Sequence, residues 1–242
     1  VLCFGIGTIL PLFKPGFFEY HDNTTVVRIF EMSKSLLDGM FPVRWVSDLG
    51  YGYGYPIFNF YAPLPYYIGA FIHLTGVDVL TATKVTIGLG MVLSGVTMYL
   101  LVRKLFGEKP ALVASCIYSF FPYHAANLYV RGAIGELFAY AFVPLVFLGF
   151  YRFLENKKQE KIANSNMLLA GVAIALVTLS HNLSAVMLFI LLSFFSLSLL
   201  VLVKKRIVAV TLILGAILIG ISLSAFYIFP AIFEMGFTNV AS

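Results

Sequence analysis

The sequence predicts an all-α fold, a bundle of helices that crosses a membrane several times. Of its 242 residues 60% are hydrophobic and only 11% are charged, whereas soluble domains carry about 25% charged residues. The charges are also clustered, and they leave long uncharged stretches at residues 85–102, 110–130, 183–203 and 207–233. Each stretch is near or above the roughly 18–20 residues with which a helix crosses the hydrocarbon core of a bilayer. A polytopic transmembrane helical bundle is therefore predicted.

Three basic clusters set the predicted topology. They lie at residues 103–109, 152–161 and 204–206, and cytoplasmic loops of membrane proteins carry an excess of Lys and Arg. With all three clusters inside, we expect seven spans, near residues 1–13, 84–102, 110–123, 137–151, 166–180, 183–203 and 207–229. The loops at 123–136 and 180–182 then face the outside. Because the first apolar run begins at Val1 and is too short to span, we expect a fragment of a longer chain.

Residues 14–83 are predicted to form the first and longest extracytoplasmic loop, and this loop carries interfacial helices. In residues 24–39 apolar side chains recur near a spacing of 3.6, which predicts an amphipathic helix on the membrane surface. Its apolar stripe is Val26, Ile29, Phe30, Leu36, Leu37 and Met40, and its polar stripe is Arg28, Glu31, Ser35 and Asp38. Residues 64–74 form a second apolar helix that is too short to span, so an interfacial or re-entrant position is expected.

Residues 50–67, GYGYGYPIFNFYAPLPYY, are rich in aromatic side chains and carry no charge. Three glycines at alternate positions exclude a regular strand or helix at the start of this segment. One interpretation is an aromatic belt that seats the loop at the level of the lipid headgroups. Another is a groove in which a lipid tail and a sugar lie against aromatic rings, and the two are compatible. The candidate substrate-binding residues of the segment are Tyr53, Tyr55, Asn59 and Tyr61.

A few polar residues are expected at the outer ends of the spans, where ionisable groups are costly and therefore candidates for function. They are His21 and Asp22 after the first span, Arg28 in the surface helix, Arg131 and Glu136 before the fourth span, and His181 with Asn182 at an outward turn. Each has a structural alternative: a helix cap for Asp22, an ion pair at the membrane edge for Arg131 and Glu136, and a capped turn for His181 and Asn182. Arg131 suits a phosphate because guanidinium binds it through two hydrogen bonds.

Several of these segments occur in one order that resembles a known family. The order is an acid in the first outer loop, G-x-F-P-x-R-W at 39–45, YGYGYP-x-FNFY-x-PLPYY at 51–67, R-K-L-F-G at 103–107 and R-G-x-x-x-E-L at 131–137. The chain resembles the bacterial membrane proteins called 6-pyruvoyl-tetrahydropterin synthase-related and, more broadly, the integral-membrane glycosyltransferases of the GT-C class. The pterin name is not taken as a function, because a pterin synthase is a soluble zinc enzyme and the sequence has no zinc-ligand spacing of that kind.

The GT-C resemblance implies that residues 1–242 form part of a GT-C-like transmembrane domain. It also implies a location in a prokaryotic plasma membrane. It implies a polyprenyl-phosphate-sugar donor, a glycan or protein acceptor, and an active face outside the cell. In that class an acid in the first outer loop is catalytic, which corresponds to Asp22, and a second acid in the next outer loop corresponds to Glu136. Members of the class often carry a pair of acids in the first loop, where this chain has His21 and Asp22. The resemblance therefore does not decide whether the reaction uses a divalent cation.

The expected reaction is sugar transfer in which Asp22 takes the proton of an acceptor hydroxyl as that hydroxyl attacks the anomeric carbon. The leaving phosphate needs a positive partner, for which Arg131, Arg28 or a bound divalent cation is available. A transporter or lipid-handling protein without catalysis is the alternative, and a non-catalytic membrane scaffold is a third. No nucleic-acid partner is expected.

Overall fold

The computed structural model describes residues 2–18, 20–155, 160–202 and 206–238, and these residues form helices without a strand. The one isolated β-bridge among them joins Val46 to Tyr55. The helices are α1 (Leu2–Ile9), η1 (Leu10–Phe13), α2 (Thr25–Leu37), α3 (Ile57–Phe60), α4 (Leu64–Leu74), α5 (Val79–Phe106), α6 (Glu108–Phe120), α7 (Pro122–Ala126), η2 (Asn127–Arg131), α8 (Ile134–Glu155), α9 (Glu160–Ser180), α10 (Asn182–Leu202), α11 (Arg206–Phe233) and η3 (Met235–Phe237). The predicted all-α class is confirmed for this part of the chain.

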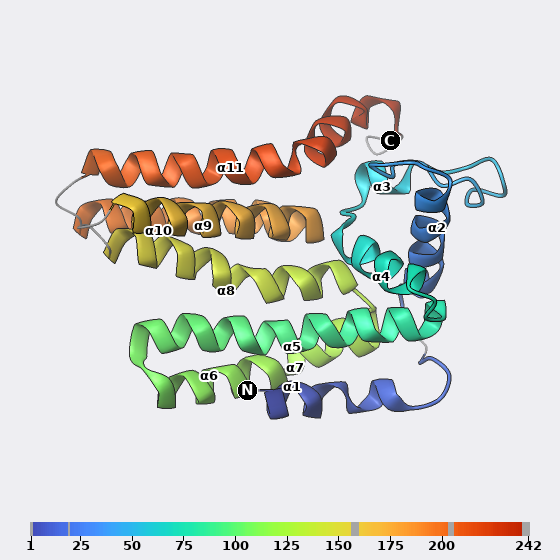
Figure 1. The fold of residues 1–242 in the computed structure, drawn as a ribbon, viewed down its shortest axis with the longest axis horizontal. Coiled ribbons are helices and arrows are strands. Elements are labelled where there is room, and N and C mark those ends of the chain that lie inside the picture. Colours follow the sequence, from blue (N-terminus) through green and yellow to red (C-terminus); the bar gives the residue numbers. More distant parts are fainter. Residues whose placement is uncertain (1, 19, 156–159, 203–205, 239–242) are drawn as a thin grey trace.

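The long helices lie side by side, with α8 packed between α5 and α9 and with α9 packed against α11 (Figure 1). Small residues bring them close: a Cβ added to Gly149 would lie 2.8 Å from Ala170, and one added to Gly220 would lie 2.5 Å from Ile174. Close backbone approach of this kind is how helices associate in membranes, where lipid tails give helix contacts no hydrophobic advantage.

Three of the described helices are long and apolar enough to cross a membrane, over Val79–Phe106, Ile134–Arg152 and Arg206–Phe237. The chain is thus a membrane protein with transmembrane helices. Shorter apolar stretches lie at Asn164–Ser180 and Asn182–Ser198.

The predicted span at 110–123 is wrong as a continuous helix. Helix α6 has 13 residues and ends at Phe120, because Phe121 takes an extended conformation with ψ of 130° before Pro122. A residue that precedes proline is driven out of the helical region by the proline ring.

The segments predicted to face outward lie together at one end of the bundle (Figure 1). Helices α2, α3 and α4 gather there, beside the starts of α5 and α8 and the ends of α9 and α11. We call this the loop end. Arg103, Lys104 and Lys109 lie at the opposite end, where α5 leads into α6, whereas residues 156–159 and 203–205 of the other basic clusters lie outside the described residues. The basic residues that are described at this turn are thus separated from the loop elements as the predicted topology requires.

Helix α2 confirms the predicted helix but corrects the orientation of its polar stripe. It packs against α4 and α5, and it buries Glu31 and Ser35, whereas Phe30 and Leu37 are exposed. Glu31 and Ser35 do not face water because the loop after α2 folds back over them, held by an ion pair of Lys34 with Asp48. Asp38, at the end of the same stripe, is exposed. Burial raises the pKa of Glu31, and the nearby charge of Asp48 raises it further.

Candidate functional site

Asp22 is the acceptor at the centre of a cluster that joins the segment before α2 to α2 and α3. Its carboxylate accepts hydrogen bonds from Thr24 Oγ1 at 2.7 Å, Arg28 Nη1 at 3.0 Å and Tyr61 OH at 3.3 Å. Arg28 also donates to Tyr66 OH at 3.2 Å, and its guanidinium lies 4.4 Å from the centre of the Tyr61 ring. Asp22, Arg28 and Tyr61 were predicted as separate candidates, and the structure brings them together.

The Asp22 carboxylate is held in its ionised form. Its partial burial acts to raise its pKa, but the hydrogen bond from Thr24, the positive charge and hydrogen bond of Arg28, and the hydrogen bond from Tyr61 together hold the pKa below its ordinary value. The Arg28 side chain is 13% exposed and that of Asp22 27%, so the ion pair is partly shielded from water. Asp22 is therefore a charged hydrogen-bond acceptor at neutral pH.

The backbone around Asp22 pairs directly with the segment that carries Arg131. The His21 N–H donates to the Val130 carbonyl at 2.9 Å, and the Asp22 N–H donates to the Arg131 carbonyl at 3.0 Å. Gly132 makes this approach possible, since its φ is +74° and a Cβ on it would lie 2.0 Å from the ring of Tyr20. Two loops that are far apart in the sequence are thereby fixed against each other.

Arg131 organises a second cluster beside the first. Its Nη1 lies 2.9 Å from Glu136 Oε2, 2.9 Å from Tyr123 OH and 3.0 Å from Asn127 Oδ1. Tyr123 OH in turn donates to Glu136 Oε1 at 2.6 Å. Arg131 is the last residue of the π-helical turn η2, and the left-handed Gly132 then turns the chain into α8, which lets a pair five residues apart meet. The Glu136 side chain is 13% exposed and that of Arg131 52%, so the arginine can still reach a ligand.

His181 lies next to the second cluster at the turn between α9 and α10. Gly135 lets α8 approach this turn, because a Cβ on it would lie 2.5 Å from the Ser180 carbonyl oxygen. His181 Nδ1 bonds Ser184 Oγ at 2.8 Å and receives the Ser184 N–H at 3.3 Å, as a residue that caps α10 does. Burial lowers the pKa of His181; the charge of Glu136 opposes this effect and that of Arg131 adds to it.

An apolar groove begins at Glu136 and runs along α8 and α10. Its volume is about 420 Å³, and its polar end is formed by Glu136, Tyr123 and Ser184. The remaining walls are aromatic or aliphatic side chains, contributed by Tyr118, Ala139, Tyr140, Val143, Met187, Leu188 and Leu191. A charged cluster at the mouth of an apolar groove matches the two parts of a lipid phosphate: a charged head and a hydrocarbon tail.

Asn59 and Asn182 belong to a third set of contacts, which fixes the short helix α3. Asn182 Nδ2 donates to the Phe60 carbonyl at 3.0 Å, and Tyr227 OH reaches the same carbonyl at 3.1 Å. Asn59 is 3% exposed and donates to Glu234 Oε2 at 2.6 Å. Both asparagines thus hold α3 against the rest of the bundle, which sets Tyr61 beside Asp22.

Tyr53 and Tyr55 do not join these clusters. They lie in a turn, not in a regular strand or helix, as the alternate glycines predict. Gly50, Gly52 and Gly54 all have positive φ there, and Tyr53 is 89% exposed. Tyr55 pairs through its backbone with Val46, and the indole of Trp45 packs against Gly54. No hydrogen bond among the described residues links either tyrosine to Asp22 or Glu136. His21 is exposed, and it contributes to the site only through its backbone N–H.

Four residues of these contacts were not predicted from the sequence: Tyr66, Tyr123, Tyr227 and Glu234. Tyr227 carried a usable signal, since a tyrosine in an apolar helix needs a hydrogen-bond partner when it is buried. Within the described ranges no group of three or more His, Cys, Asp or Glu is arranged to hold a metal ion. Asp22 and Glu136, the two predicted acids, each face an arginine instead.

Comparison with known families agrees with the membrane character of the chain. A family model described as "6-pyruvoyl-tetrahydropterin synthase related domain; membrane protein" matches residues 58–242. The match covers more than half of the chain and includes Tyr61, Arg131, Glu136 and His181, whereas Asp22 precedes it. No curated protein and no solved structure matches the chain.

Proposed function

The chain belongs to the 6-pyruvoyl-tetrahydropterin synthase-related family of membrane proteins, and from this premise we propose that it is a GT-C-like glycosyltransferase. It would move a sugar from a polyprenyl-phosphate-linked donor to a glycan or protein acceptor on the outer side of a prokaryotic plasma membrane. The observation that carries the proposal is the cluster of Arg131, Glu136 and Tyr123 at the mouth of the apolar groove.

Arg131 and the groove supply the contacts that a lipid-linked donor needs. The tail would lie along α8 and α10, and the phosphate would bind the half-exposed guanidinium of Arg131. Charge-assisted bonds between guanidinium and phosphate are strong and directional. Glu136 and Tyr123 would orient Arg131, because both bond the same guanidinium nitrogen.

Asp22 would act as the base toward the acceptor. Its backbone pairing with Arg131 holds it next to the proposed phosphate site. To accept a proton from the acceptor hydroxyl, the carboxylate must exchange one of its present donors, Thr24 or Tyr61, for that hydroxyl. Arg28 stays ion-paired with Asp22, and its charge would help to stabilise the phosphate as it leaves.

The test is sugar transfer by purified Asp22→Asn protein in liposomes that contain a panel of polyprenyl-phosphate sugars. Asparagine keeps the size of aspartate but cannot take the proton, and loss of a general base costs about 10²–10⁴-fold in rate. We expect transfer to fall by at least about 100-fold while donor binding persists. The matched control is Asp48→Asn, which removes the other ion-paired aspartate of the first loop and should leave transfer unchanged. Full activity of Asp22→Asn would end the assignment of Asp22 as the base.

A lipid-handling protein without catalysis is the second candidate, and one observation favours it. Both predicted acids are occupied by arginines, so neither is a free base in this conformation. This function predicts saturable binding of the lipid phosphate by the wild-type protein with no transfer to any acceptor. It also predicts that Asp22→Asn changes lipid affinity, not a rate.

A further inference from the structure

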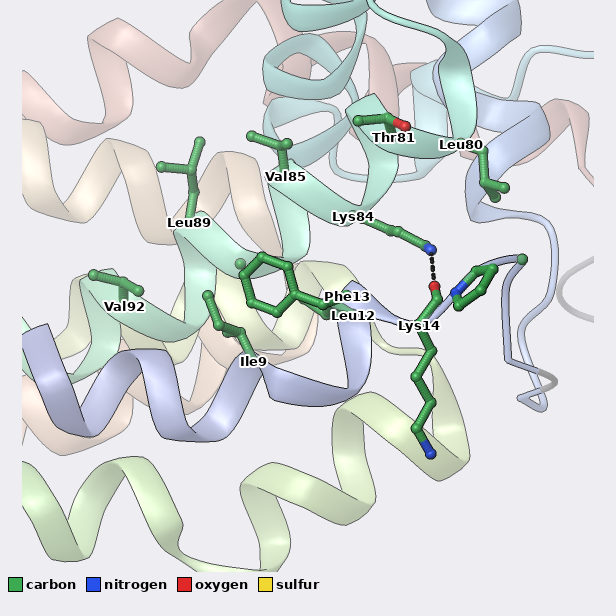
Figure 2. Close-up of a pocket in the computed structure, with 13 residues that line it drawn as sticks. Ile9, Leu12, Phe13, Lys14, Leu80, Thr81, Lys84, Val85, Leu89 and Val92 are labelled. Carbon is green, nitrogen blue, oxygen red and sulfur yellow. Dashed lines mark hydrogen bonds between the residues drawn. The ribbon is translucent and has the colours of Figure 1, made fainter.

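A second cavity lies away from the groove, between η1 and the first half of α5. Its volume is about 650 Å³. Figure 2 shows Ile9, Leu12 and Phe13 on one side of it and Val85, Leu89 and Val92 on the side of α5. Because α5 is one of the helices able to cross a membrane, this cavity runs along a surface that lipid tails can reach.

Two lysines mark the loop end of this cavity. Lys84 Nζ donates to the carbonyl oxygen of Lys14 at 2.7 Å (Figure 2). A neighbouring cavity of about 390 Å³ is lined by both lysines with Phe17, Phe18 and Tyr129. The two cavities share Lys14 and Lys84 in their walls. The Lys84 ammonium lies at the Lys14 backbone, whereas the Lys14 side chain extends away from it (Figure 2).

The charges of these lysines are uncompensated in the described part of the chain. Arg28, Lys34 and Arg131, which lie at the same end of the bundle, each form an ion pair with a carboxylate. No described carboxylate lies within ion-pair distance of Lys14 or Lys84, and Glu19 is outside the described residues. Arg44 also lacks such a partner, but it is exposed in the loop after α2 and lines neither cavity.

We propose that this cavity is a binding site for an anionic phospholipid. One acyl chain would lie between η1 and α5, and the phosphate would bind Lys84 at the end of this cavity, where the Lys14 side chain would turn to reach it. The proposal does not depend on the glycosyltransferase assignment, since it uses neither Asp22 nor the groove at Glu136. An ammonium group on an apolar stem suits this place, because the stem packs on hydrocarbon while the charge stays at the level of the headgroups.

The test uses the purified full chain in detergent, delipidated and titrated with dioleoyl phosphatidylglycerol, with bound lipid counted by native mass spectrometry. Phosphatidylcholine with the same chains and inorganic phosphate are the comparison ligands. We expect one phosphatidylglycerol to bind in preference to phosphatidylcholine and to resist millimolar inorganic phosphate. Lys84→Ala should weaken this binding about fivefold, which is the usual contribution of one basic residue to attraction by anionic lipid.

Further variants separate the contribution of the lysine charge to lipid binding from that of the cavity. Leu89→Trp should weaken the binding of both lipids, because the larger side chain fills the cavity beside α5. Arg44→Ala removes a charge at the same end, and Leu218→Trp alters an exposed leucine of α11 that lines neither cavity; both should bind as the wild type does. Lys84→Arg keeps the positive charge, so it shows whether a substitution at this position allows the protein to fold. If Lys84→Ala does not fold, Lys14→Ala takes its place.

Equal binding of the two lipids would overturn the proposal. Wild-type affinity in Lys84→Ala and Lys14→Ala, or in Leu89→Trp, would overturn it as well. Displacement of phosphatidylglycerol by inorganic phosphate would reassign the lysines to a free anion and would also end the lipid assignment.

Discussion

At the scale of single residues, the site depends on one glycine as much as on its charged groups. Asp22 can bond the backbone of Arg131 only because Gly132 leaves room for the ring of Tyr20. The same glycine has a φ of +74°, which turns the chain from η2 into α8 and so brings Glu136 back to Arg131. The relative position of the two acids therefore rests on Gly132.

We predict that Gly132→Ala destabilises the protein more than Gly39→Ala does. Gly39 also has positive φ, but a Cβ on it would meet no atom within 4 Å, so its replacement costs only the backbone strain of about 1–2 kcal/mol. Gly132→Ala adds the clash with Tyr20, and overpacking costs about 1–3 kcal/mol more. Thermal unfolding of both variants in the same detergent measures the difference. Equal loss of stability would show that Tyr20 moves away freely.

At the scale of elements, α3 is the part that connects the site to the bundle. It has four residues and cannot be stable alone, since isolated helices need about 12–15 residues. Its position comes from hydrogen bonds of its own residues Asn59 and Phe60 to α10, α11 and the segment after α11. The packing of α10 and α11 therefore fixes the position of Tyr61, and Tyr61 in turn bonds Asp22.

Tyr227→Phe should loosen α3 without changing the shape of α11. The substitution removes the one hydroxyl proton that the Phe60 carbonyl and Asn182 Oδ1 now share. A lost hydrogen bond of this kind costs about 1 kcal/mol. Hydrogen exchange of residues 57–61 should become faster. Tyr99→Phe is the control, because the Tyr99 hydroxyl has no hydrogen bond among the described residues; similar exchange in both variants would contradict the role of Tyr227.

Many of the helices and turns could be predicted from the sequence, because uncharged stretches and glycine spacing determine the structure of the residues in which they occur. Helices α2, α4 and α5 and the irregular tyrosine turn followed from such patterns. The contact of Asn59 with Glu234 joins residues 175 positions apart, and no local pattern reports it. The burial of Glu31 and Ser35 in α2 was missed because helical periodicity does not report that the loop after the helix folds back over it. Asp22, Arg28, Arg131 and Glu136 were found as rare charges in apolar sequence, but their pairing depends on how the loops pack.

At the scale of the whole molecule, the two ends of the bundle differ in kind. One end holds the loop elements and the clusters of Asp22 and Glu136, and the described basic residues at the turn from α5 to α6 lie at the other (Figure 1). The excess of basic residues on cytoplasmic loops predicts that the loop end faces the outside of the cell. The proposed transfer reaction requires this orientation, because polyprenyl-linked donors are expected there.

Cysteine labelling of the intact cell tests this orientation. In a background without Cys3 and Cys116, Ser47→Cys and Gly236→Cys place exposed thiols at the loop end, whereas Lys109→Cys places one at the opposite end. Ser180, at the outward turn after α9, is not chosen as a labelling position because it is 1% exposed. We expect a membrane-impermeant maleimide to modify the first two and to modify Lys109→Cys only after the membrane is opened. Labelling of Lys109→Cys in intact cells, with protection of the other two, would put Asp22 and Arg131 on the cytoplasmic side, where a donor presented outside the cell could not reach them.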